Sequence, residues 1–147
     1  MQAVLSDTLP TSTPTSLPSI SKARRWTGRS LSGLAIAFLG FDTVMKLLLA
    51  APAVQTTGEL GYPVSTVIGI GIVELICVLA YALPRSAVLG AVLLTGYLGG
   101  AIATHVRVGS PLFSHVLFPV YVAALVWGGL YLRDDRLRAF LPFAARK

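Results

Sequence analysis

The sequence predicts an all-α fold: a four-helix transmembrane bundle with its N-terminus and C-terminus both cytoplasmic. The first observation is composition, because 54% of the 147 residues are hydrophobic and only 12% are charged, whereas soluble domains carry about 25% charged residues. The second is that the apolar residues gather into four runs, each of roughly 20 residues, the length that spans a hydrocarbon core of about 30 Å. The third is that polar breaks with turn residues fall between these runs.

Three segments follow one another along the chain. Residues 1–25 are rich in Ser, Thr and Pro and hold too little apolar surface to pack, so we expect a disordered cytoplasmic tail. A four-helix membrane domain covers residues 26–141, and a basic C-terminal tail covers residues 142–147. The expected helices lie at about 31–51, 64–83, 87–106 and 112–132.

The breaks between the runs have turn chemistry. Residues 52–63 begin and end with proline and contain two glycines, so we expect a loop there. The break at 83–86 is so short that the second and third helices must be antiparallel neighbours. Gly109, Ser110 and Pro111 separate the third helix from the fourth.

Basic residues predict the orientation. The N-terminal flank contains Lys22, Arg24, Arg25 and Arg29, while Arg107 is the basic residue on the opposite side. Lys and Arg concentrate on the cytoplasmic side of membrane proteins, so both ends are expected inside. We therefore interpret the basic residues behind the net charge of +6 as residues that set the topology and contact anionic lipid headgroups. The predicted partner is the lipid bilayer and not nucleic acid.

Several polar residues interrupt the apolar helices. Ionisable side chains at membrane depth are costly and need a partner or a water-filled cavity. Asp42 and Lys46 lie four residues apart, hence on one helix face, and Glu74 lies near the middle of the second helix. We expect a polar cluster, in the middle and outer half of the bundle, that opens outward. Its candidate residues are Asp42, Lys46, Glu74, Tyr97, Thr104, His105, Arg107 and His115.

Three interpretations of this cluster remain open. It could be a structural ion-pair network, in which Lys46 pairs with Asp42 and Glu74 pairs with Lys46 or Arg107. It could bind a small polar or amphipathic ligand, with its cations facing an anion or a quinone carbonyl. It could also be a proton path through Asp42, Glu74 and the histidines. Two histidines without a third ligand make a poor metal site, so no metal is expected.

Glycines inside the runs predict close helix packing. Gly96 and Gly100 form a small-xxx-small pair on the third expected helix. Such pairs allow helix backbones to approach closely in lipid. We expect them to serve packing within the bundle, and the alternative is a homo-oligomer face.

The chain resembles the DoxX-like family of small bacterial four-helix membrane proteins. The resemblance covers roughly residues 26–141 and rests on short motifs. These are Lys46 after Phe41-Asp42, Gly61-Tyr62-Pro63 leading into Gly69–Glu74, Pro84-Arg85, Leu89-Gly90-Ala91, the segment Gly99–Arg107 and Pro111.

This resemblance implies a multi-pass protein of the bacterial cytoplasmic (inner) membrane, with Lys46, Glu74, His105 and Arg107 as its polar centre. Some relatives are tied to quinone-linked sulfur oxidation or to membrane redox complexes. The leading hypothesis is therefore a subunit or accessory of a quinone-linked oxidoreductase, with quinone as the candidate cofactor and other membrane redox subunits as partners. No soluble-enzyme motif is present, and no catalytic residue is assigned. A non-catalytic structural or assembly protein is the alternative. A small transporter is the third hypothesis. The sequence shows no internal inverted repeat, which argues against it.

Overall fold

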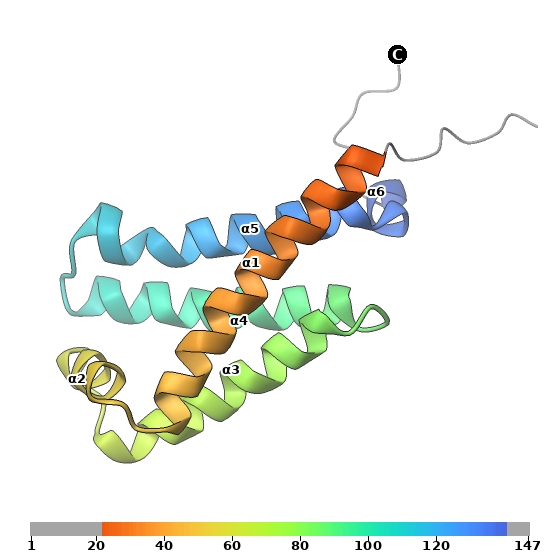
Figure 1. Cartoon of the computed structure of the whole chain (residues 1–147). Helices are drawn as coiled ribbons and strands as arrows, with labels where there is room; N and C mark the ends of the chain where they lie inside the picture. The colour runs from red at the N-terminus through yellow and green to blue at the C-terminus, as the bar shows by residue number, and fades with distance from the viewer. Residues whose placement is uncertain (1–21, 141–147) are drawn as a thin grey trace, which may run out of the picture.

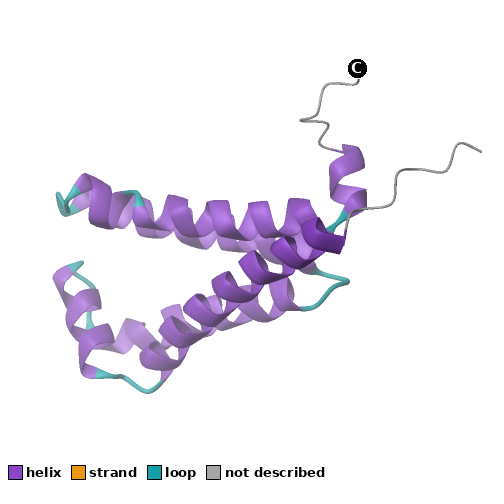
Figure 2. Ribbon diagram, turned by 45° about the horizontal axis from the view of Figure 1, so that its top comes forward, coloured by secondary structure: helices purple, strands orange, loops and turns teal. Residues whose placement is uncertain are grey.

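The computed structural model describes residues 22–140, and this part of the chain is helical with no strand (Figure 2). This confirms the predicted all-α fold. The elements are α1 (Lys22–Leu47), α2 (Ala51–Glu59), the 3-10 turn η1 (Val64–Thr66), α3 (Val67–Ala82), α4 (Ala87–Arg107), the π-helical turn η2 (Leu112–Val116), α5 (Phe118–Arg133) and α6 (Asp135–Phe140). Residues 1–21 and 141–147 lie outside the described part, so the predictions for most of the N-terminal tail and for the C-terminal tail stay predictions.

Four helical segments are long and apolar enough to cross a membrane. They are Lys22–Leu47, Val64–Ala82, Ala87–Arg107 and Leu112–Arg133. Between 22% and 33% of each apolar window is buried inside the protein, so most of the surface of each span is apolar and faces outward. A soluble protein could not expose so much apolar surface, whereas a bilayer is the solvent that favours it. The chain is therefore a multi-pass membrane protein.

The four spans form a ring in which α1 packs on α3 and α5, and α4 packs on the same two helices (Figure 1). The start of α1 and the short α6 lie at one end, which we call the terminal end, where Arg24 pairs with Asp135 at 3.8 Å. Helix α2 and the α4–α5 connection lie at the other end, which we call the loop end. From the terminal end toward the loop end, the pair α1–α3 diverges from the pair α4–α5 (Figures 1 and 2). The cytoplasmic location of the terminal end stays a prediction.

The first span differs from the sequence expectation. It begins at Lys22 instead of residue 31 and ends at Leu47 instead of residue 51, so its first turn overlaps the expected disordered tail. Hydropathy marks only the apolar part of a helix, while Lys and Arg are good helix formers that extend it beyond the hydrocarbon core. The chain then reverses through Leu49, which has a φ of 50°, before α2 begins.

The expected loop at 52–63 is largely the helix α2. Pro52 lies in its first turn, where the missing N–H is not needed and the fixed φ suits a helix. Proline therefore starts this helix rather than preventing it. Helix α2 ends before Gly61, whose φ of 82° is a left-handed conformation that glycine adopts without strain.

Close contact between α1 and α5 holds the terminal end together. A Cβ added to Gly28 would lie 2.9 Å from the Gly129 carbonyl oxygen, and one added to Gly129 would lie 2.8 Å from the Ser32 nitrogen. A side chain at either position would force the helices apart. Beside this crossing, the buried Tyr81 of α3 donates to the Val126 carbonyl at 2.7 Å, and its oxygen lies 2.9 Å from Ser32 Oγ. One phenol thus connects α1, α3 and α5.

Tyr81→Phe is expected to lower the free energy of unfolding in detergent by about 1–2 kcal/mol, because it leaves the buried Ser32 hydroxyl and the Val126 carbonyl without this partner. Denaturant titration of the purified protein measures the change. The matched control is Tyr121→Phe, since the half-exposed Tyr121 makes no side-chain hydrogen bond to a described residue. Equal stability of the two variants would contradict this role of Tyr81.

Candidate functional site

The α1–α3 contact places a lysine against a buried glutamate. Gly71 of α3 faces α1 so closely that an added Cβ would lie 3.0 Å from Lys46 Cβ and 3.3 Å from Leu47 Cδ2. Glu74 lies three residues further along α3, hence on the same helix face. The missing side chain at Gly71 therefore lets Lys46 reach Glu74 across the interface.

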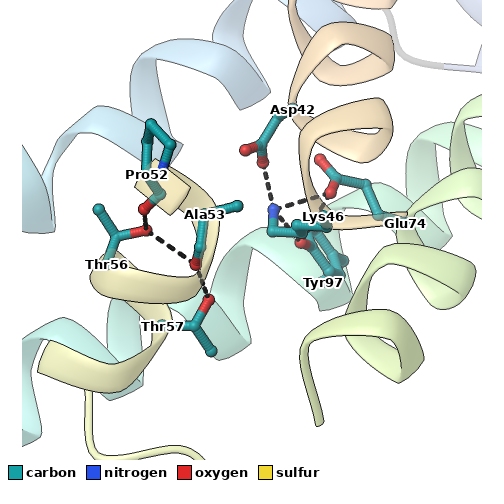
Figure 3. Close-up of polar contacts among 8 residues, drawn as sticks. All are labelled: Asp42, Lys46, Pro52, Ala53, Thr56, Thr57, Glu74 and Tyr97. Carbon is teal, nitrogen blue, oxygen red and sulfur yellow. Dashed lines mark hydrogen bonds and ion pairs between the residues drawn. The ribbon is translucent and has the colours of Figure 1, made fainter. Parts of the chain in front are cut away.

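Lys46 is the centre of a group of four side chains from three helices, which we call the lysine cluster: Asp42, Lys46, Glu74 and Tyr97 (Figure 3). The Lys46 ammonium donates to Asp42 Oδ2, to Glu74 Oε2 at 2.9 Å and to Tyr97 Oη at 3.1 Å. The Tyr97 hydroxyl in turn donates to Glu74 Oε2 at 3.0 Å. Lys46 thus pairs with Asp42, and it is one of the two partners predicted for Glu74; Tyr97 of α4 completes the group.

The members of the lysine cluster differ in exposure. The Glu74 side chain is fully buried and the Lys46 side chain is 13% exposed, while the Asp42 side chain is 42% exposed. Removing charges from water is costly unless they are paired and hydrogen-bonded. When both carboxylates are ionised, two negative charges face one ammonium, and Asp42 is the most accessible part of the cluster.

A cavity of about 810 Å³ lies beside the lysine cluster, and α1, α3, α4 and α5 all contribute to its lining. This volume falls within the range of about 300–1,000 Å³ typical of small-molecule sites. Asp42, Lys46, Glu74 and Tyr97 contribute to its lining, together with the small residues Gly96 and Gly100 of α4. Apolar side chains form much of the remaining wall: Phe38, Leu39, Ile70, Leu98, Phe118 and Val122.

The other predicted residues gather at the loop end. Thr104, His105 and His115 line the same cavity, and the two imidazole rings lie 5.6 Å apart between centroids. We call His105 and His115 the histidine pair. Arg107 is directed toward the α2–α3 connection, where it donates to the Leu60 carbonyl at 2.6 Å and lies over the Tyr62 ring. The structure therefore pairs Glu74 with Lys46 and not with Arg107.

Helix α2 supplies cavity residues that the sequence analysis missed. Thr56, Thr57 and Glu59 line the cavity, although the segment was expected to be a loop. The Thr56 and Thr57 hydroxyls donate to carbonyls of the preceding turn of α2 (Figure 3). The sequence could have indicated this helix, because Pro52 is followed by no further helix breaker until Gly58.

No metal centre is evident in residues 22–140. There, no group of three or more His, Cys, Asp or Glu residues is placed to hold a metal ion. The histidine pair instead contacts neighbouring serines, with His105 Nδ1 lying 3.1 Å from Ser110 Oγ and His115 Nδ1 lying 2.8 Å from Ser114 Oγ.

Comparison with known protein families shows which family the chain belongs to. The sequence model of the DoxX-like family matches residues 30–129, which is more than half of the chain. The chain belongs to the DoxX-like family. The match includes the lysine cluster and the histidine pair, and it confirms the resemblance found in the sequence. No curated protein and no solved structure shows significant similarity to the chain.

In this DoxX-like protein, Lys46→Met is expected to lower the free energy of unfolding by about 3–5 kcal/mol, because it leaves the buried Glu74 carboxylate without its cation. The double variant Lys46→Met with Glu74→Leu removes both charges and is expected to recover most of this loss. Denaturant titration in detergent measures both.

The matched control for this prediction is Arg107→Met, which removes an exposed cation outside the lysine cluster and is expected to change stability by less than about 1 kcal/mol. A double variant no more stable than Lys46→Met alone would show that the charges do not act as a pair.

Proposed function

We propose that this DoxX-like membrane protein binds a lipid-soluble quinone in the cavity and acts as a redox-associated subunit or accessory of a quinone-linked oxidoreductase. The observation that carries the proposal is a cavity with apolar walls and the lysine cluster on one side. An isoprenoid quinone has the corresponding chemistry, with a polar ring attached to an apolar tail. Ligand sites in proteins commonly combine a mostly apolar lining with a few polar groups that orient the ligand.

The aromatic contact between α1 and α5 supports a ligand that enters from lipid. Phe38 and Phe118 meet edge to face with their ring centroids 5.3 Å apart. Both rings line the cavity, and the two residues are 40% and 43% exposed. In this proposal, the cavity meets the acyl chains between these two rings. A long apolar tail could leave the cavity by this route while the polar ring stays inside.

The second candidate is a structural or assembly protein, and the saturation of Lys46 favours it. An ammonium group has three donors, and Asp42, Glu74 and Tyr97 accept all three. In this alternative the lysine cluster sets the register of α1, α3 and α4 and binds no ligand. The two candidate functions differ in one measurable property: the first requires that a ligand binds in the cavity, and the second requires no ligand.

Gly100→Leu tests the cavity directly. Gly100 lines the cavity, and a Cβ added there meets no atom within 4 Å, so a leucine can occupy this space while the helices keep their positions. We expect the wild-type protein in lipid nanodiscs to bind a short-chain quinone, and Gly100→Leu to weaken this binding at least tenfold. Isothermal titration calorimetry measures the affinity.

Gly99→Leu is the matched control. Gly99 is the preceding residue on α4, and an added Cβ there also meets no atom within 4 Å, but Gly99 is outside the cavity lining. This variant is expected to bind the quinone like the wild type. Wild-type protein that binds no quinone, or equal binding by the two leucine variants, would refute the cavity as a quinone site.

A further inference from the structure

We infer that the cavity selects a head group that donates hydrogen bonds, so that it binds the hydroquinone in preference to the quinone. The inference rests on the proposed function and adds the redox form of its ligand. The inference follows from a comparison of two sets of polar atoms in the cavity lining: those that already have a hydrogen-bond partner within the protein, and those that have none and could bind a ligand.

The donors of the lysine cluster are all engaged. The three N–H groups of Lys46 point to Asp42, Glu74 and Tyr97, and the Tyr97 hydroxyl donates to Glu74 Oε2. A quinone carbonyl can only accept hydrogen bonds. It would therefore have to displace an internal, charge-assisted hydrogen bond to gain a donor from this cluster.

Four of the five remaining hydroxyls of the lining are engaged within the protein, and the fifth, on Ser110, lies 3.1 Å from His105 Nδ1. Thr56 and Thr57 donate to carbonyls within α2, and Thr104 donates to the Gly100 carbonyl at 2.9 Å. Because the Thr104 hydrogen is used there, the Tyr62 hydroxyl is the donor in its 3.2 Å contact with Thr104 Oγ1. None of these four side chains offers a ligand a free O–H group.

Within the lysine cluster, two carboxylate oxygens are left as acceptors. Glu74 Oε1 is buried and has no hydrogen-bond partner among the described residues. Asp42 Oδ1 likewise accepts no hydrogen bond from residues 22–140, and the Asp42 side chain is 42% exposed in the cavity lining. A buried acceptor without a partner is unfavourable. A ligand hydroxyl would reach Glu74 Oε1 only after a rotation of that fully buried side chain, whereas the Asp42 side chain is already exposed.

Charge favours the same ligand. With Asp42 and Glu74 both ionised, the lysine cluster has one excess negative charge, which repels the partly negative oxygen of a quinone carbonyl and attracts the hydrogen of a hydroquinone hydroxyl. The second hydroxyl, on the opposite side of the ring, would face the histidine pair, where an imidazole nitrogen can either donate or accept. The hydroquinone can therefore form hydrogen bonds with both the carboxylates and the histidine pair, while the quinone can form them only with the histidine pair.

The test compares three ligands of nearly the same shape in wild-type protein in nanodiscs under anaerobic conditions: a short-chain quinone, its hydroquinone, and the dimethyl ether of that hydroquinone, which has no donor. Isothermal titration calorimetry gives each Kd. We expect the hydroquinone to bind at least tenfold more tightly than the quinone, and the ether to bind no more tightly than the quinone.

Two variants and one control assign the preference to the carboxylates. Asp42→Asn and Glu74→Gln replace an acceptor oxygen with an amide group that can donate to a quinone carbonyl, so each is expected to bring the hydroquinone-to-quinone preference toward one. Asp42→Asn leaves the Lys46–Glu74 pair intact and is informative even where Glu74→Gln fails to fold. Asp135→Asn removes an exposed carboxylate at the terminal end and is expected to keep the wild-type preference.

The outcomes separate the inference from the proposed function. Wild-type protein that binds none of the three ligands refutes both. Wild-type protein that binds the quinone as tightly as the hydroquinone, or more tightly, overturns the inference and leaves the proposed function standing. A proton carried on Glu74 Oε1 would make that atom a donor and produce this second result. An unchanged preference in both Asp42→Asn and Glu74→Gln would also overturn the assignment to these carboxylates.

Discussion

The Lys46 ammonium determines how this bundle is organised in its apolar part. A charge at that depth is tolerated only when other groups replace the water that it has lost. Here α1 supplies Asp42, α3 supplies Glu74 and α4 supplies Tyr97, so one cation fixes the relative positions of three helices. The helices cannot slide past one another without breaking these bonds. The cluster therefore sets the helix register, which nondirectional contacts between apolar side chains specify poorly.

The two ends of the bundle have opposite roles. At the terminal end, Gly28 and Gly129 bring α1 and α5 into backbone contact, and Tyr81 ties α3 to the same crossing. At the loop end the helix pairs diverge, and the cavity occupies the space between them. The close contact at the terminal end stabilises the bundle where its helices meet, while the helix pairs contact each other less closely at the loop end.

The sequence predicted the spans well because hydropathy and span length are local properties of the chain. Lys46, Asp42 and Glu74 were also predictable as a group, since a buried charge requires a partner. The role of Gly71 and the separation of Arg107 from Glu74 were not predictable, because both depend on how α3 is rotated against its neighbours. Helix α2 was missed because a proline within an apolar-to-polar transition is compatible with either a loop or a helix start.

The structural and ligand-binding interpretations of the lysine cluster do not exclude each other. A lysine with three internal partners is a poor contact for a ligand carbonyl, but the same bonds orient Asp42 and Glu74 so that each keeps one oxygen without a partner. In the proposed site, the cation would therefore act on a ligand through the carboxylates that it positions, and not by direct contact. A site built in this way offers acceptors next to a fixed positive charge, which limits their negative potential and allows the Glu74 carboxylate to be buried. That property would allow the ligand hydroxyl to bind and leave reversibly.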